Sequence, residues 1–235
     1  MIFLYKTLCL QARRLRKAMG IVRGKRSNLI VRVLIYLLGV GMLALGVVLN
    51  IKTDYGVSPV NSLPYTISQI SGMELGNTTM LCYLLYILIQ FLIMKRNHNY
   101  NKNLLLQLPF GILFGKFTTL FNHYLSFQLS QHHQRLAVML LAVFFTALGI
   151  FITISMHIVP IPPDGLTNEI AKLMNKDLGM AKILFDIASV LMALIISFIF
   201  VGKIIGIGYG TLFCAFFIGR TVTIFKKVIL IKPKN

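Results

Sequence analysis

The sequence predicts an all-α membrane protein with six transmembrane helices, arranged as two inverted three-helix repeats that each carry a short extra helix. The first observation is composition, because 57% of the 235 residues are hydrophobic and only 13% are charged. A soluble domain carries about 25% charged residues. The second observation is an internal repeat: Gly46 and Pro59 recur as Gly149 and Pro162, about 103 positions later. Duplicated membrane domains often form a binding site where their halves meet.

The repeat continues through most of the chain. Leu75 and Gly76 are followed at the same offset by Leu178 and Gly179. After one inserted residue, the stretch from Gly115 to Phe121 corresponds to that from Gly219 to Phe225. Two residues that correspond in this way are called repeat mates below.

Six apolar segments have the length of about 20 residues that a membrane-crossing helix needs. Lysine and arginine gather in the termini and in the alternate connections between these segments, and the positive-inside rule places those parts in the cytoplasm. Each half holds three crossings, an odd number, so the halves enter the membrane from opposite sides. The predicted crossings are residues 29–51, 78–94, 104–121, 136–158, 180–201 and 204–225.

The domain organisation follows from these crossings. Residues 1–28 form a basic arm, residues 29–121 the first repeat, residues 135–225 the second repeat, and residues 226–235 a basic tail. Both termini are predicted to be cytoplasmic. The arm is expected either to lie as a helix in the membrane interface or to remain a disordered tail.

The formal net charge of +18 comes from lysine and arginine in tails and loops. Its expected partners are the lipid bilayer and anionic lipid headgroups, and no nucleic acid. The sequence has no metal-ligand spacing, no phosphate-binding loop and no catalytic triad order, so we expect no metal, no cofactor and no enzymatic activity.

A short extra helix is predicted between the first two crossings of each half, over residues 60–72 and 164–176. Asn61 or Ser62 in the first half, and Asp164 in the second, are residue types that cap helix N-termini. Gly72 and Gly179 are the expected C-terminal breaks. Two placements stay open: an interfacial helix on the membrane surface, or a re-entrant helix that dips toward the midplane.

The run Tyr55-Gly-Val-Ser-Pro-Val-Asn-Ser-Leu63, together with Pro162-Pro-Asp-Gly-Leu166, resembles the YczE/YyaS/YitT group of bacterial integral membrane proteins. The likeness extends from about Arg32 to Phe225. It implies a multi-pass protein of the bacterial plasma membrane, and a transporter is one role that it suggests. That group often has Trp-Asp after the first proline, whereas this chain has Val60-Asn61.

Ionisable residues inside crossings are expensive and therefore candidates for function. Asp186 and Arg220 both lie near the predicted cytoplasmic ends of their crossings, at a depth where they could pair. Lys182, one helical turn from Asp186, is a second candidate partner. The alternatives are a structural salt bridge for Asp186 and, for Arg220 and its repeat mate Lys116, side chains that extend to the headgroups.

Two functions are compared. The first is a small transporter or permease for an unknown small-molecule substrate, with a ligand site between the repeats formed by Asn61, Ser62, Asp164, Asp186 and Arg220. Paired helix N-termini would favour an anion, whereas Asp164 would favour a cationic or zwitterionic ligand. The alternative is a non-transporting accessory protein that organises a membrane complex or binds anionic lipid.

Overall fold

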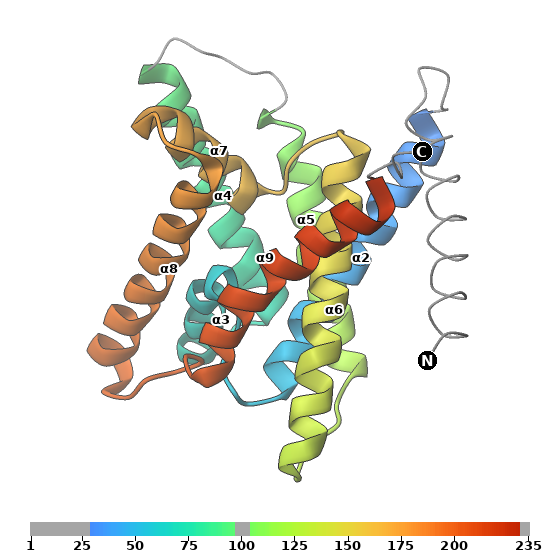
Figure 1. The fold of residues 1–235 in the computed structure, drawn as a ribbon. Coiled ribbons are helices and arrows are strands. Elements are labelled where there is room, and N and C mark those ends of the chain that lie inside the picture. Colours follow the sequence, from blue (N-terminus) through green and yellow to red (C-terminus); the bar gives the residue numbers. More distant parts are fainter. Residues whose placement is uncertain (1–28, 97–103, 231–235) are drawn as a thin grey trace, which may run out of the picture.

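The structure is a computed structural model that describes residues 29–96 and 104–230. The basic arm and the last residues of the basic tail lie outside these ranges. The described part contains eight α-helices and no β-strand (Figure 1). They are α2 (Leu29–Lys52), α3 (Pro59–Ser71), α4 (Leu75–Arg96), α5 (Gln107–Tyr124), α6 (His132–Met156), α7 (Pro162–Met174), α8 (Leu178–Val201) and α9 (Tyr209–Leu230).

The expected all-helical architecture is confirmed, and four of the described helices are long and apolar enough to cross a membrane: α2, α4, α6 and α8. These helices indicate a membrane protein. Helices α5 and α9 occupy the two other predicted crossings but do not reach the same apolar composition. The crossing predicted from residue 204 began too early, because the glycine-rich stretch before Tyr209 is not helical and Gly206 adopts a left-handed φ of 71°.

Helices α2 and α6 pack closely through two glycines that are repeat mates. A Cβ atom added to Gly46 would lie 2.5 Å from the backbone nitrogen of Thr146, and one added to Gly149 would lie 2.5 Å from that of Leu43. Thr146 and Leu43 are themselves repeat mates, so the two contacts are equivalent. Small residues are used in this way wherever helix backbones approach each other in membranes.

The ends of α2 and α6 are equivalent as well. Asp54 and His157 are repeat mates, and both adopt the left-handed conformation, with φ of 56° and 49°. An arginine from the start of the opposite helix lies against each of them. Arg135 forms an ion pair with Asp54 at 3.7 Å, and its repeat mate Arg32 donates a hydrogen bond to the backbone oxygen of His157 at 3.4 Å.

Both predicted extra helices are present, as α3 and α7. Their N-caps are Ser58 and Ile161, in extended conformations, and a proline follows each cap. The caps predicted at Asn61, Ser62 and Asp164 were therefore wrong: proline has a preset φ and no N–H, which suits it to the first helical position.

The predicted C-terminal break was confirmed for α3 but not for α7. Gly72 ends α3 in the left-handed conformation, as expected. Asn175, its repeat mate, ends α7 in the same conformation, and Gly179 lies inside α8. The break predicted at Gly179 was wrong, because asparagine also tolerates this conformation and ends the helix earlier.

Most helix contacts repeat between the halves, but those of α4 with α5 and of α3 with α9 have no equivalent of comparable extent. Three contacts occur in both halves: α3–α8 corresponds to α7–α4, α3–α4 to α7–α8, and α2–α5 to α6–α9. Helix α4 also packs on α5, where Gly76 and Gly115 are buried and a Cβ added to Gly76 would lie 2.1 Å from the backbone oxygen of Gly115. The equivalent packing of α8 on α9 is not made. Gly179 and Gly219 are exposed, and an added Cβ at Gly219 would meet no atom within 4 Å.

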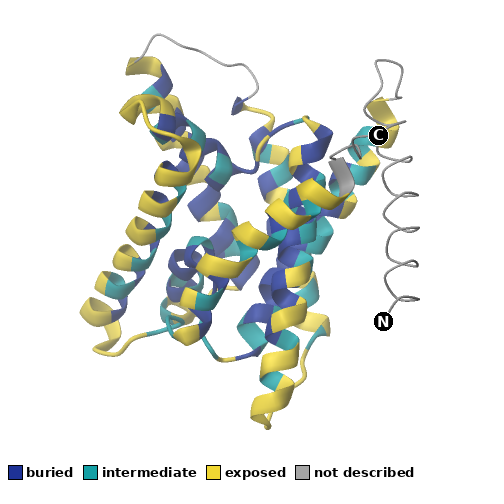
Figure 2. Ribbon diagram, viewed as in Figure 1, coloured by how far each residue is buried: buried dark blue, intermediate teal, exposed yellow. Residues whose placement is uncertain are grey.

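Figure 1 shows each long helix running in the opposite direction to its repeat mate: α2 and α6, α4 and α8, α5 and α9. Figure 2 shows many buried residues on α2, α4 and α6, and exposed residues along α8 and α9. The exposed residues of α8 are largely apolar, including Ile183, Ile187, Leu191 and Ile195. Such a surface suits contact with lipid.

Candidate functional site

The buried start of α7 organises the candidate site. Pro162 and Pro163 occupy its first two positions and are buried, whereas Leu173 and Met174 at its other end are exposed. Helix α3 has the same polarity, with a buried start and an exposed end at Ser71. Both short helices therefore begin inside the protein and end at its surface.

Asp164 is the third residue of α7, and its side chain is half-buried. Within the described ranges no hydrogen bond or ion pair reaches its carboxylate. It lies close enough to Lys182 and Asp186 of α8, and to Lys226 of α9, for electrostatic interaction. Burial raises the pKa of the Asp164 carboxyl above its ordinary value, because removal from water disfavours the charged form.

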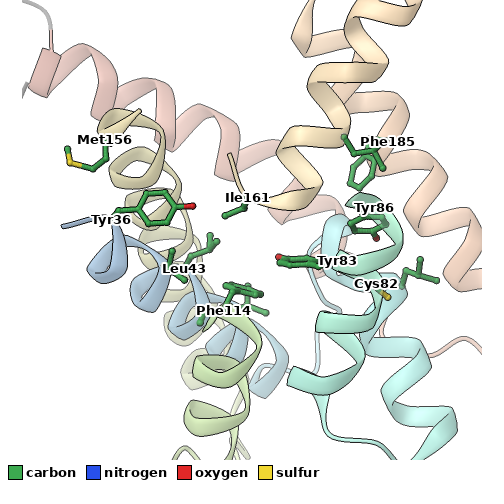
Figure 3. Close-up of a cluster of buried hydrophobic side chains, with 14 residues drawn as sticks. Tyr36, Leu43, Cys82, Tyr83, Tyr86, Phe114, Met156, Ile161 and Phe185 are labelled. Atoms are coloured by element: carbon green, nitrogen blue, oxygen red, sulfur yellow. The ribbon is translucent and has the colours of Figure 1, made fainter. Parts of the chain in front are cut away.

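Two buried tyrosines lie near Asp164. The carboxylate acts electrostatically on the hydroxyl groups of Tyr36 from α2 and Tyr83 from α4. Figure 3 shows these side chains on opposite sides of the core cluster, with both hydroxyl oxygens directed toward the space below Ile161. Asp164 follows Ile161 by three residues, in the first turn of α7.

Aromatic packing holds both tyrosine rings in place. The Tyr36 ring packs edge-to-face on Phe110, with centroids 4.6 Å apart, and its hydroxyl donates to the backbone oxygen of Val159 at 3.0 Å. The Tyr83 ring stacks on Phe114 at 5.4 Å. No described residue forms a hydrogen bond with the Tyr83 hydroxyl. Both rings are therefore fixed within the core cluster.

The predicted pairing of Asp186 with Arg220 was wrong. Asp186 accepts a hydrogen bond from Lys182 at 2.9 Å, which is the second partner that the sequence offered. Arg220 is exposed and its guanidinium lies 3.5 Å from the centre of the Phe216 ring. The separation of α8 from α9 accounts for both observations. Lys116, the repeat mate of Arg220, is exposed too.

Asn61 and Ser62 are buried, but their polar groups are occupied within their own helix turn. The Asn61 amide donates to the Ser58 hydroxyl at 2.8 Å, and the Ser62 hydroxyl donates to the backbone oxygen of Pro59 at 2.6 Å. Asn61 is the repeat mate of Asp164. The first half thus has a neutral amide bonded within its own helix turn, where the second half has a carboxylate without a partner among the described residues.

A second polar cluster supports α7 from the side of α4 and α5. Gln90 and Gln107, both buried, exchange amide hydrogen bonds of 3.1 and 2.9 Å, and the Gln90 amide also donates to the backbone oxygen of Pro162 at 3.0 Å. Gly165 leaves room for this pair, since an added Cβ would lie 2.5 Å from Oε1 of Gln90. These bonds position the first turn of α7.

Replacing Gln107 with leucine is expected to destabilise the protein by about 1–3 kcal/mol, because the Gln90 amide loses partners inside the protein. The check is the thermal unfolding midpoint of the purified protein in detergent. Gln128→Leu is the matched control, since Gln128 is exposed and a surface change costs at most about 0.5 kcal/mol. Equal midpoints for the two variants would show that the amide pair does not stabilise α7.

At the opposite end of the molecule, His132 stands in the first turn of α6, and the Tyr55 hydroxyl lies 2.8 Å from its Nδ1. A cavity of about 370 Å³ is lined by Tyr55, His132, His133, Tyr209 and neighbouring apolar residues. In the described part of the chain, no group of three histidine, cysteine, aspartate or glutamate residues is placed to hold a metal ion.

Sequence reasoning missed Tyr36, Tyr83, Gln90 and Gln107. Neither tyrosine differs in its sequence pattern from a core aromatic residue, and the glutamines carry no charge. The one signal available was Gln90, a polar residue within a largely apolar crossing. Such residues in membrane helices generally face the protein interior.

Comparison with known proteins assigns the chain to a family. Residues 30–227 match the family described as "Family of unknown function (DUF6198)", and the chain belongs to this family. A search of curated proteins and a search of solved structures each gave no match. This match does not test the resemblance to the YczE/YyaS/YitT group, which stays a prediction.

Proposed function

We propose that this protein is a small membrane transporter that moves a small molecule through a site at the start of α7, by alternating access. The single observation that carries the proposal is the unequal packing of the two halves around Asp164. Helix α4 packs closely on α5 through buried glycines, whereas α8 does not pack on α9. The accessory role is the competing function.

The proposal includes an inverted repeat with six crossings. Its support is the opposite direction of mated helices in Figure 1, together with the shared backbone conformations of Asp54 and His157. It also takes α3 and α7 as re-entrant helices, since their starts are buried and their ends exposed. Irregular backbone is tolerated at membrane depth where protein surrounds it.

The two halves are related in sequence but differ in packing. A second conformation arises when each half adopts the packing that the other half has in this structure. In that conformation α8 closes on α9 through Gly179 and Gly219, while α4 opens from α5. Both sets of glycines are present in the sequence, but only one set is in contact here. Rocking of one repeat against the other around a fixed site is the usual form of alternating access in inverted-repeat transporters.

The exchange predicts a disulfide that the present arrangement does not permit. In the double variant Gly179→Cys/Gly219→Cys, the thiols are expected to become linked when membranes are treated with an oxidation catalyst. A disulfide requires Cα atoms within about 7 Å, which the second conformation supplies. Linkage is measured with a maleimide polymer that labels free thiols. A disulfide prevents this labelling, and reduction restores it.

Three variants serve as controls. The single variants Gly179→Cys and Gly219→Cys reveal any linkage to native cysteines. The pair Gly179→Cys/Leu212→Cys places the second thiol seven residues earlier on α9, about 10 Å along the helix, and should stay unlinked. If the Gly179/Gly219 pair remains fully labelled as well, the halves do not exchange, and the accessory role becomes the better proposal.

A further inference from the structure

We propose that a cavity beside α7 binds a small zwitterion of the α-amino acid type, its ammonium group on Glu169 and its carboxylate on Lys172. This inference rests on the proposed function, since it names the class of molecule that would occupy the site at the start of α7. The cavity has a volume of about 410 Å³. It lies along α7, the short helix that packs on α4 and α8 (Figure 1).

Polar groups from three helices line this cavity. Glu169 follows Gly165 by one helical turn and precedes Lys172 by another, so these three residues lie along one side of α7. A further part of the wall comes from Gln90 of α4 and Gln107 of α5, which are buried and joined by amide hydrogen bonds. Because these amides bond each other, they are held in position before any ligand binds.

The two charged groups of the cavity differ in burial. The Lys172 ammonium donates a hydrogen bond of 2.7 Å to Oε1 of Glu169. The Glu169 side chain is only 10% exposed, whereas the Lys172 side chain is 57% exposed. The carboxylate therefore lies inside the protein, and its partner reaches the surface.

The charge balance favours a ligand without net charge. Among the described residues that line the cavity, Glu169 and Lys172 are the only charged ones, and their charges cancel. A simple cation or anion would pair with one of them and leave the other without its partner. A buried charge without a partner is costly. A zwitterion complements both charges at once.

The short distance between the two charges favours an α-amino acid. Because Lys172 Nζ and Glu169 Oε1 are 2.7 Å apart, the ligand groups that pair with them must also be close together. In an α-amino acid a single carbon atom joins the ammonium group to the carboxylate. A carboxylate offers about four acceptor positions and an ammonium three donors, so each residue can keep its present bond and accept a second partner.

The remaining walls leave room for a side chain of the ligand. Met94, Leu104 and Leu178 supply apolar surface. Asn168 also lines the cavity, and no described residue forms a hydrogen bond with its amide. Apolar side chains and amide side chains therefore both have a wall to contact.

The test uses the purified full-length protein in detergent, with L-leucine and L-glutamine as probes for these two kinds of wall. Each is compared with its amide, which lacks the carboxylate, and with its N-acetyl derivative, which lacks the ammonium group. Binding is measured as a concentration-dependent rise in the unfolding midpoint.

We expect at least one of the two amino acids to stabilise the wild type at concentrations at least about tenfold lower than its derivatives require, because each derivative loses one charged hydrogen bond. No stabilisation by either amino acid would overturn the inference. Equal stabilisation by the amino acid and one of its derivatives would overturn it as well.

Three variants locate the effect. Glu169→Gln and Lys172→Gln should each weaken the response at least about tenfold, and Lys172→Gln changes a surface position that is not needed for folding. Lys176→Gln makes the same change at another exposed lysine and should respond as the wild type does. An undiminished response in either Glu169→Gln or Lys172→Gln would contradict the two-point contact.

The comparison of ligands within Lys172→Gln separates a direct contact from a structural role. The amide of the amino acid lacks only the group that Lys172 pairs with. The advantage of the amino acid over its amide should therefore disappear in this variant, as expected for two groups that contact each other. If the full advantage persists, the ligand carboxylate does not contact Lys172.

Amino acid binding and transport can fail separately. If the Gly179/Gly219 disulfide forms but neither amino acid has an effect, the halves exchange and the ligand class is wrong. If an amino acid binds through Glu169 and Lys172 but the disulfide never forms, the cavity is a binding site in a protein that does not exchange its halves.

Discussion

Replacing Gly149 with valine is expected to prevent the protein from folding. A Cβ atom at this position would lie 2.5 Å from the backbone nitrogen of Leu43 and 2.7 Å from the backbone oxygen of Gly39. Both neighbours belong to the backbone of α2, so no side-chain rotation can relieve the overlap. Helices α2 and α6 would have to separate, at a cost above the roughly 1–3 kcal/mol typical of overpacked cores.

The measurement is the yield of monodisperse protein after solubilisation, followed by size-exclusion chromatography. The matched control is Gly219→Val, which makes the same change in a helix where an added Cβ meets no atom within 4 Å. We expect the control to elute as the wild type does and Gly149→Val to aggregate or disappear. Equal yields would mean that α2 and α6 do not pack as closely as the structure shows.

Replacing Gly219 with leucine is expected to leave the protein folded and to stop the proposed exchange between two conformations. The side chain has room in the present structure, so the unfolding midpoint should stay close to that of the wild type. In the second conformation it would occupy the place where α8 meets α9. A variant that favours one state by several kcal/mol leaves the other almost unpopulated.

The readout is the labelling rate of a thiol at the opposite contact. Thr119 of α5 lies against Gly76, its hydroxyl 2.2 Å from the place of an added Cβ, so Thr119→Cys should react only when α4 opens from α5. Adding Gly219→Leu should slow that reaction at least about tenfold. The control Leu212→Ala, on the same helix, should not change the rate. An unchanged rate with Gly219→Leu would show that opening of α4 is not coupled to closure of α8.

Much of the helical framework could be predicted from the sequence, because it depends on local properties. Apolar segments of sufficient length located α2, α4, α6 and α8, and the prolines at residues 59 and 162 located the starts of α3 and α7 to within a few residues. The caps were misplaced because proline at the first helical position moves the cap one residue before it.

The candidate site could be predicted only in part. Asp164 was identified from its place just after the prolines that begin the second extra helix, at the position that corresponds to Asn61. The pairing of Asp186 with Arg220 failed because it required α8 and α9 to be in contact, and the spacing of residues within helices does not determine which helices meet. Tyr36 and Tyr83 were missed because tyrosines in apolar helices are indistinguishable by pattern from core residues.

The glycine contacts between α2 and α6 have a mechanical consequence. Gly46 and Gly149 are repeat mates, and each lies against the backbone of the helix that holds the other. If the two halves exchanged their packing, the contacts between α2 and α6 would therefore stay the same. This helix pair can keep its geometry in both conformations, whereas α4, α5, α8 and α9 change partners. In the proposed exchange the α2–α6 pair would be the stationary pivot of the molecule, and its backbone amides should be the last to exchange with deuterium.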